Sequence, residues 1–155
     1  MHGSVAETVA LQAVIPALFF PPNARGFIDG MSGDVLLKRV LMPVDHEPAP
    51  AQAFRAIAGF LNLFGDYDLE LRVIHVGTSA PSIISRDRIE GMGAVELRGG
   101  RAIDAILGEA EDWNADLIIM PTAGHSGLTD AIHGSTSERV LRRAPCPVLT
   151  VPARH

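Results

Sequence analysis

A turn-rich segment near the end of the chain has the composition of a phosphate-binding loop. It reads PTAGHSGLTDAIHGSTSERV from Pro121 onward, with Gly124 before the turns and Gly134-Ser135 after them. Glycines let backbone N–H groups approach an anion, and the helix expected to begin at Ser135 presents free N–H donors. A capping box of Ser135 and Glu138 explains the same residues without a ligand. The loop alone therefore does not decide between a phosphate site and an ordinary helix start.

Acidic and histidine residues are the other candidates for chemistry. Asp45, His46 and Glu47 are adjacent, but neighbours on one loop seldom point at one ion, and no second cluster has ligand spacing, so no metal site is predicted. His125 and His133 lie in the turn-rich loop, where they could offset phosphate charge or act as a general acid, although solvated histidines are the expectation. Since no Ser-His-Asp set or carboxylate pair is recognisable, no catalytic residue is predicted.

The composition limits the class of protein. The chain has 155 residues, 47% hydrophobic and 20% charged, which suits one ordinary core. A net charge of -5 without a long Lys/Arg cluster argues against nucleic acid and anionic membranes as partners. The single cysteine, Cys146, excludes an internal disulfide and suits a reducing cytoplasm. Residues 5–20 are apolar but interrupted by Glu7, Gln12 and Pro16, so neither a signal peptide nor a membrane span is predicted.

The two ends of the chain repeat each other. Residues 2–21 align without a gap on residues 133–152, and nine of the twenty positions are identical, including Gly-Ser and two prolines in register. Each copy encodes a capped helix, an Ala-x-x-Pro break and a short apolar strand. Residues 1–22 are therefore interpreted as the remnant of a preceding domain of the same kind.

Between the repeats, hydrophobic periodicity predicts strands alternating with helices. Residues 22–37 carry Pro22, Asn23, Gly26, Gly30 and Gly33, so residues 23–37 are expected to form a linker, with a small hairpin across Gly30 to Gly33. The domain is expected over residues 38–153. Its predicted strands are 38–44, 69–76, 93–98 and 117–120, its predicted helices are 48–64 and 101–113, and the second repeat copy supplies the last helix and strand.

These elements predict an α/β fold. Nearly unbroken apolar strands joined by short connections indicate a parallel sheet with helices on both faces. In such a doubly wound sheet the ligand site lies beyond the carboxyl ends of the strands, at the point where the strand order reverses. The residues that follow Val44, Val76 and Met120 are the ones expected there. His75, near the end of a buried strand, is expected to be a hydrogen-bonded core histidine.

The domain resembles the universal stress protein family. The resemblance spans residues 38–152 and is carried by RVLMPVD, LRVIHV, the spacing Gly-x9-Gly-Ser, and SERVLRRAPCPVL. It implies a Rossmann-like, five-stranded parallel sheet of order 3-2-1-4-5. It also implies an adenine nucleotide, ATP or AMP, between the ends of strands 1 and 4, with Mg²⁺ accompanying ATP. The residues that it places around the nucleotide are Pro43, Val44, Asp45, Val76, Pro121, Gly124, Gly134, Ser135 and Thr136, with Asp45 accepting from a ribose hydroxyl.

Two departures from the family pattern change what is expected. Pro121 occupies the leading glycine position of the family's full loop, and since proline has no N–H, one phosphate donor is lost. Only 16 residues separate Val76 from Gly93, where the family usually carries a long helix. One face of the sheet is therefore expected to be covered by the N-terminal segment or by another subunit.

Three functions follow from these observations. The first is a regulatory domain that binds an adenine nucleotide, has no strong catalytic machinery of its own, and forms the second domain of a tandem-type family member. The second is a dimerisation or interaction module without nucleotide, motivated by Pro121. The third is a weak nucleotide phosphohydrolase, and His125 is the only residue that supports it. Because family members pair through their last strands, a homodimer is expected, and residues 15–20 are expected to lie antiparallel beside residues 147–151 of this chain or its partner.

Overall fold

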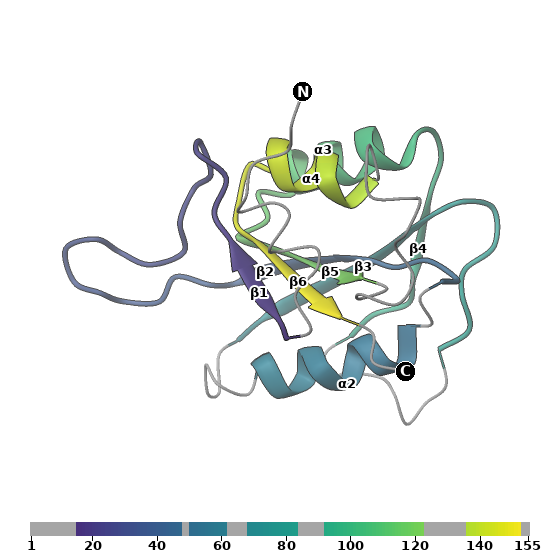
Figure 1. Cartoon of the computed structure of the whole chain (residues 1–155), viewed down its shortest axis with the longest axis horizontal. Helices are drawn as coiled ribbons and strands as arrows, with labels where there is room; N and C mark the ends of the chain where they lie inside the picture. The colour runs from purple at the N-terminus through teal and green to yellow at the C-terminus, as the bar shows by residue number, and fades with distance from the viewer. Residues whose placement is uncertain (1–14, 48–49, 62–67, 84–91, 123–135, 153–155) are drawn as a thin grey trace.

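A six-stranded mixed sheet forms the middle layer of the computed structural model, which describes residues 15–47, 50–61, 68–83, 92–122 and 136–152. Helices α3 and α4 cover one face of the sheet and α2 covers the other (Figure 1). The elements are β1 Ala17–Phe19, β2 Arg39–Pro43, α2 Pro50–Leu61, β3 Glu70–Val76, β4 Glu96–Arg98, α3 Ala102–Asp112, β5 Leu117–Thr122, α4 Thr136–Arg143 and β6 Val148–Pro152.

The sheet has the order β1-β6-β5-β2-β3-β4. The prediction of a five-stranded, wholly parallel sheet is wrong, because β1 adds a sixth strand that runs antiparallel to β6. The five strands after the linker are all parallel to their neighbours and lie in the order β4-β3-β2-β5-β6. The predicted third strand also begins too early, since β4 holds only the last three residues of the range 93–98.

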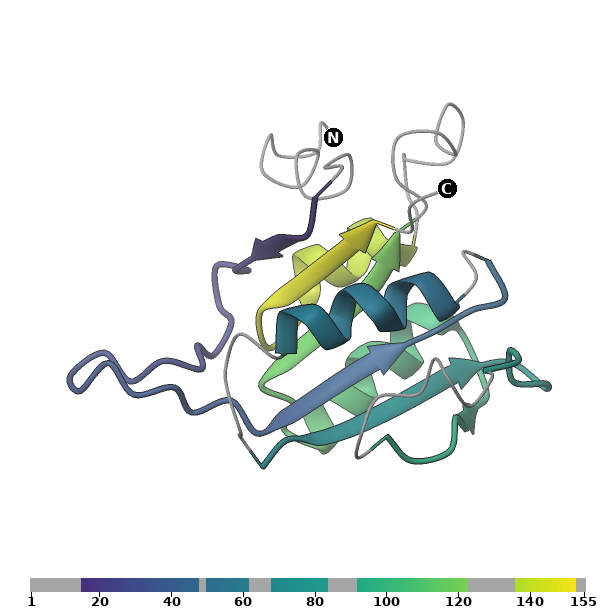
Figure 2. The same ribbon diagram turned by 90° about the horizontal axis from the view of Figure 1, so that it is seen from below.

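The pairing of β1 with β6 has an internal symmetry. Ala17 lies opposite Thr150, Leu18 opposite Leu149 and Phe19 opposite Val148. Leu18 and Leu149 are equivalent positions of the sequence repeat, so the register is that of a two-fold axis between them. The antiparallel placement predicted for residues 15–20 is confirmed, with the partner strand in the same chain (Figure 2).

Each face of the sheet has its own apolar cluster. On one face, Phe54 and Ile57 are three residues apart on α2 and fully buried. On the other, Ile106 and Ala110 of α3 are joined by Val140 and Leu141 of α4. The central strands β2 and β5 are buried on both faces, which explains their apolar runs Val40–Met42 and Leu117–Met120. Among the described helices, none is long and apolar enough to cross a membrane.

The predicted linker takes part in the core. Phe27 and Leu37 are 3% and 2% exposed and belong to the same buried cluster as α2. Between them the chain forms an arm that projects from the sheet (Figures 1 and 2), with a bridge between Ile28 and Val35. The predicted hairpin is thus confirmed. The stem of the arm therefore packs on the same face of the sheet as α2.

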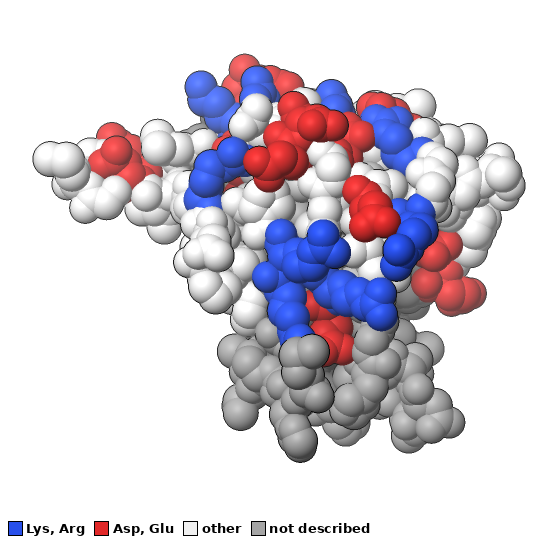
Figure 3. All heavy atoms as spheres, turned by 90° about the horizontal axis from the view of Figure 1, so that it is seen from above, with Lys and Arg blue, Asp and Glu red and all other residues white. Residues whose placement is uncertain are grey.

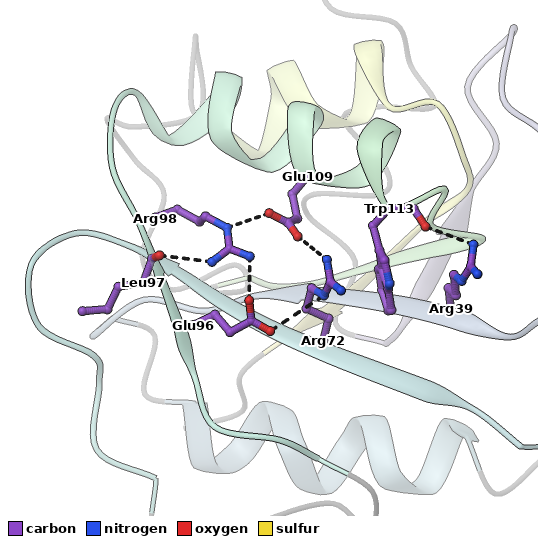
Figure 4. Close-up of polar contacts among 7 residues, drawn as sticks. All are labelled: Arg39, Arg72, Glu96, Leu97, Arg98, Glu109 and Trp113. Carbon is purple, nitrogen blue, oxygen red and sulfur yellow. Dashed lines mark hydrogen bonds and ion pairs between the residues drawn. The ribbon is translucent and has the colours of Figure 1, made fainter.

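A charged network joins α3 to the edge of the sheet. Glu109 of α3 accepts hydrogen bonds from Arg72 of β3 at 2.5 Å and from Arg98 of β4 at 2.6 Å (Figure 4). Arg98 also bonds Glu96 at 2.6 Å, and the guanidinium of Arg72 lies 4.2 Å from the ring centre of Trp113. Since the Glu109 side chain is only 13% exposed, this carboxylate anchors the short strand β4 to α3.

Acid is expected to weaken this anchor. The hydrogen bond from Arg98, with that from Arg72, holds the pKa of Glu109 below its ordinary value near 4.5. The contribution of Glu109 to stability is therefore complete above that value and is lost as the pH falls through the lower folded pKa. We expect Glu109→Gln to cost roughly 1–2 kcal/mol in urea unfolding near pH 7, and less at about pH 3.

The matched control for Glu109 is Glu111→Gln, which removes an exposed carboxylate from the same helix. It should leave the urea midpoint unchanged at both pH values. An equal loss of stability in both variants would contradict a specific anchor.

The surface over α3 and α4 carries charges of both signs. Groups of acidic side chains lie next to groups of basic ones there, instead of one continuous basic field (Figure 3). Arg142 and Arg143 end α4, and Arg142 pairs with Glu138 one turn earlier at 2.9 Å. The single cysteine, Cys146, is fully buried, and burial raises the pKa of its thiol to about 12, so it is not a nucleophile at neutral pH.

Candidate functional site

A cavity of about 240 Å³ lies at the carboxyl ends of the parallel strands. The ends of β2, β3 and β5 form its floor, and α3 and the first turn of α4 form its walls. The lining residues are Pro43, Val44, Asp45, Glu47, Val76, Ala102, Ile106, Met120, Pro121, Thr136 and Ser137. Small-molecule sites of α/β sheets are expected in this position.

The strand register sets the floor of the cavity. Pro43 is the last residue of β2 and lies opposite Ile74 of β3, and the amide of Val44 continues the ladder by donating to Ile74 O at 2.9 Å. The chain leaves the sheet at Asp45, whose side chain is 71% exposed. On the neighbouring strand, β3 ends at Val76, two residues after Ile74. The apolar floor is thus followed at once by an accessible carboxylate.

The structure brings together most of the residues predicted for the nucleotide. Six of them line the cavity, namely Pro43, Val44, Asp45, Val76, Pro121 and Thr136. The other three, Gly124, Gly134 and Ser135, lie outside the described residues, as do His125 and His133. Pro121 is within β5, opposite Val151 of β6, so the strand continues through the position of the family's first loop glycine.

Five lining residues were not predicted. Ala102 and Ile106 come from α3, whose apolar positions were assigned to the core, and Met120 is the last apolar residue of its predicted strand. Glu47 and Ser137 follow Asp45 and Thr136 by two residues and one. Apolar residues of α3 recur with the same helical spacing whether they face the sheet or line a cavity. The sequence therefore gives no signal that separates the two roles.

Two histidines stand beside the cavity, next to Asp45. His75 is 5% exposed and its Nδ1 lies 3.0 Å from the carbonyl oxygen of Val44, so the prediction of a hydrogen-bonded core histidine is confirmed. The same Nδ1 is 3.8 Å from Asp45 Oδ1. His46 Nε2 lies 3.1 Å from Ser79 O, and the two rings meet edge to face with centres 5.1 Å apart. A side chain at Gly77 would collide with the His75 ring, which explains a glycine there.

The cavity wall carries negative charge at the end next to β2. Asp45 and Glu47 are its charged residues within the described part of the chain, and no Lys or Arg of that part lines it. A phosphate would therefore be repelled from the β2 end. At the opposite end, Thr136 and Ser137 begin α4, where free backbone N–H groups and the helix dipole favour an anion. The arrangement suits a ligand with hydroxyl groups at one end and an anionic group at the other.

Comparison with known proteins finds similarity to one family. Residues 88–152 match the model of the universal stress protein family. A universal stress protein of Methanocaldococcus jannaschii is 26% identical over 151 residues, covering 77% of this chain and 85% of the relative. Another, from Synechocystis, is 27% identical over 152 residues, covering 85% and 95%. These matches support the assignment of this chain to the universal stress protein family.

Solved universal stress protein structures share the fold. The crystal structure of one from Archaeoglobus fulgidus has a TM-score of 0.67 and 29% identity, and the match covers 97% of this chain but 54% of that one. This chain therefore spans about half of that universal stress protein. A universal stress protein in complex with cAMP has a TM-score of 0.53 at 23% identity, covering 76% of this chain and 98% of its own. A family protein from Arabidopsis thaliana with AMP bound has a TM-score of 0.54 at 17% identity, covering 76% and 92%.

Proposed function

We propose that this protein is a universal stress protein-type regulatory domain that binds an adenine nucleotide, AMP or ATP, between the ends of β2 and β5. The observation that carries the proposal is the position of the cavity. The chain proceeds from β2 to β3 and β4 on one side and then returns to β5 on the other, so the strand order reverses between β2 and β5. The cavity lies at the ends of both strands, where doubly wound sheets bind nucleotides.

The lining supports one orientation of the nucleotide. Pro43, Val44 and Val76 offer apolar surface and backbone groups for adenine, and Asp45 offers an acceptor for a ribose hydroxyl. Thr136 stands at the helix start, where the phosphate would lie with Gly124, Gly134 and Ser135 of the preceding loop. The acidic end repels phosphate, so it favours the same orientation. The structures with cAMP and AMP bound share the fold and are consistent with a nucleotide in this crevice.

Pro121 favours the alternative of an interaction module without nucleotide. Proline lacks the N–H that glycine would present at this point of the wall. If the lost donor is essential for the triphosphate, ATP binds more weakly than AMP, with or without Mg²⁺. Replacement of Pro121 by glycine restores the donor and separates the two functions.

Calorimetric titration of the full chain with AMP and with ATP, each with and without Mg²⁺, tests the proposal. We expect heat of binding for at least one nucleotide and a loss of affinity of about 10–100-fold in Asp45→Ala, since a hydrogen bond to a charged group is worth about 1.5–3 kcal/mol. Asp112→Ala is the matched control, because it removes an exposed carboxylate from the last turn of α3.

The absence of heat with every nucleotide, both in the natural chain and in Pro121→Gly, would contradict nucleotide binding and leave the interaction module. Equal affinities in Asp45→Ala and Asp112→Ala would contradict the proposed orientation. Release of ADP or AMP from ATP that survives Asp45→Ala would point to a phosphohydrolase elsewhere.

We also propose that residues 1–22 correspond to the end of a preceding domain, as in a tandem-type family member, followed by a linker of residues 23–37 and the domain of residues 38–153. The two-fold register of β1 on β6 supports this proposal, because two equivalent strands pair in that way across a symmetric interface. The match of nearly the whole chain to about half of the Archaeoglobus fulgidus protein is consistent with it. In this arrangement β1 takes the position that the last strand of a second subunit would have in a homodimer.

A further inference from the structure

The projecting arm holds large apolar side chains in solvent. Its exposed apolar residues are Ile28, Met31 and Leu36, at 55%, 100% and 52%. Full exposure of Met31 contributes nothing to the stability of its own domain, because hydrophobic side chains stabilise a fold only when they are buried. Methionine is enriched in the contact surfaces between proteins. The arm therefore carries an apolar surface that its own domain does not cover.

Hydrogen bonds hold the turn of the arm, residues 29–34, in one shape. Asp29 Oδ1 accepts from the amides of Met31 and Ser32, both at 2.8 Å. The amide of Asp29 donates to the carbonyl oxygen of Asp34 at 2.8 Å, and Gly33 has the positive φ of 77° that suits glycine. A segment that is ordered before it binds loses less conformational entropy on binding. The turn thus presents Met31 in a defined position.

The arm and its base carry opposite charges. Residues 26–37 include Asp29 and Asp34 but no Lys or Arg. At the base of the arm, a hollow of about 440 Å³ is lined by three basic residues, Arg25, Lys38 and Arg39. Figure 3 shows acidic side chains on the projecting arm and basic ones near the place where it joins the body. The remaining lining residues of the hollow are Leu36, Asn114 and Asp116.

The hollow keeps a positive charge in the folded chain. Arg25 donates to the amide oxygen of Asn114 at 3.1 Å, and Arg39 donates to the carbonyl oxygen of Trp113 at 3.3 Å, so both bond neutral oxygens. Asp116 is the acidic residue of the hollow, and its Oδ2 accepts from two backbone amides at 3.0 and 2.9 Å. Three cations beside one carboxylate attract an anionic partner.

We propose that the arms of two copies of this chain lie side by side in opposite directions, with the acidic turn of each arm on the basic hollow of the other copy. Within one chain, the turn projects away from the body that carries the hollow (Figures 1 and 2). Two arms in opposite directions bring each turn to the base of its partner. The contact is isologous, because both copies contribute the same turn and the same hollow. It also covers the exposed apolar side chains of the arm.

A contact made by the arm is small. Interfaces below about 1,200 Å² belong to weak and transient complexes. We therefore expect a reversible dimer in concentrated solution, whereas the full chain is a monomer in dilute solution. This dimer does not use the edge of β6, which β1 occupies in the same chain. It does not depend on nucleotide binding either, because no residue of the arm lines the cavity.

Sedimentation velocity of the full chain over a range of concentrations tests the arm contact. We expect the mean mass to rise from that of one chain toward that of two. Asp34→Lys on the turn and Lys38→Glu in the hollow should each weaken the dimer by roughly 5–10-fold, because a symmetric dimer contains each change twice. Both residues are exposed, so the urea midpoint should stay unchanged. Met31→Ser should also weaken the dimer, through loss of apolar contact.

A mixture of Asp34→Lys and Lys38→Glu gives the sharpest test. In a mixed pair, one contact has the natural charge on both sides and the other has the charge exchanged on both sides. The mixture should therefore associate more strongly than either variant alone. Asp104→Lys is the control, because it reverses an exposed carboxylate in the first turn of α3, and it should leave the dimer unchanged.

Three results would overturn the arm contact. They are a mass that stays that of one chain at every concentration, equal association of Asp34→Lys and Asp104→Lys, and a mixture that associates no more strongly than its two components. Nucleotide titration of Asp34→Lys keeps this proposal separate from the nucleotide site, because its affinity for nucleotide should equal that of the natural chain.

Discussion

Deletion of residues 1–22 is expected to convert the protein into a dimer or a poorly soluble species. Without β1, the outer edge of β6 presents the unpaired backbone groups of a fully buried strand, Val148–Pro152. Exposed edges of this kind pair with other chains. The two-fold register shows that a strand equivalent to β6 fits there, so a second copy of β6 is the natural replacement. Sedimentation or light scattering would show a doubled mass.

The control deletion removes residues 1–14 only and keeps β1 with the residues that lead into it. It should preserve the oligomeric state of the full chain. If the deletion of residues 1–22 gives an equally soluble species of unchanged oligomeric state, β1 does not protect the edge of β6. The proposal that residues 1–22 correspond to the end of a preceding domain then loses its main support.

Replacement of Phe27 by alanine is expected to cost about 3–5 kcal/mol in the free energy of unfolding, the usual loss for a buried phenylalanine. Phe27 lies in a segment with the composition of a linker, yet it is 3% exposed and its ring centre is 6.2 Å from that of Phe20. Its carbonyl oxygen accepts from the amide of Leu36, which closes the stem of the arm. Urea unfolding followed by circular dichroism would measure the loss.

The neighbouring residue provides the control for Phe27. Ile28 is 55% exposed, so Ile28→Ala should change the stability by less than about 0.5 kcal/mol. Similar values for the two variants would mean that the stem of the arm does not pack against the domain in solution.

Much of the fold could be predicted because its signals are local. Apolar runs predict β2, β3, β5 and β6 to within a few residues, and the helical spacing of apolar residues does the same for α2 and α3. The end-to-end repeat, together with the resemblance to a family whose members pair through their last strands, predicted that β1 would lie antiparallel to β6. The strand number was wrong because the remnant was counted outside the domain, although its strand completes the same sheet.

The rest could not be predicted because it depends on contacts between distant segments. The burial of Phe27 follows from its packing in the apolar cluster under α2, which a Gly-rich composition does not reveal. The contact of His75 with Asp45 requires the register of two parallel strands, and the place of Ile106 in the cavity wall requires the packing of α3 on the sheet. Sequence identified the strand ends that meet at the site but not which side chains share it.

The pairing of β1 with β6 also bears on the order of folding. The hydroxyl of Thr150 donates to the carbonyl of Ala17 at 3.2 Å, across 133 residues of chain. Closing so long a loop for a three-residue strand is entropically unfavourable until the rest of the sheet exists. β1 should therefore dock last and open first, and its amide protons should exchange with solvent before those of the parallel strands, while the domain beneath stays folded.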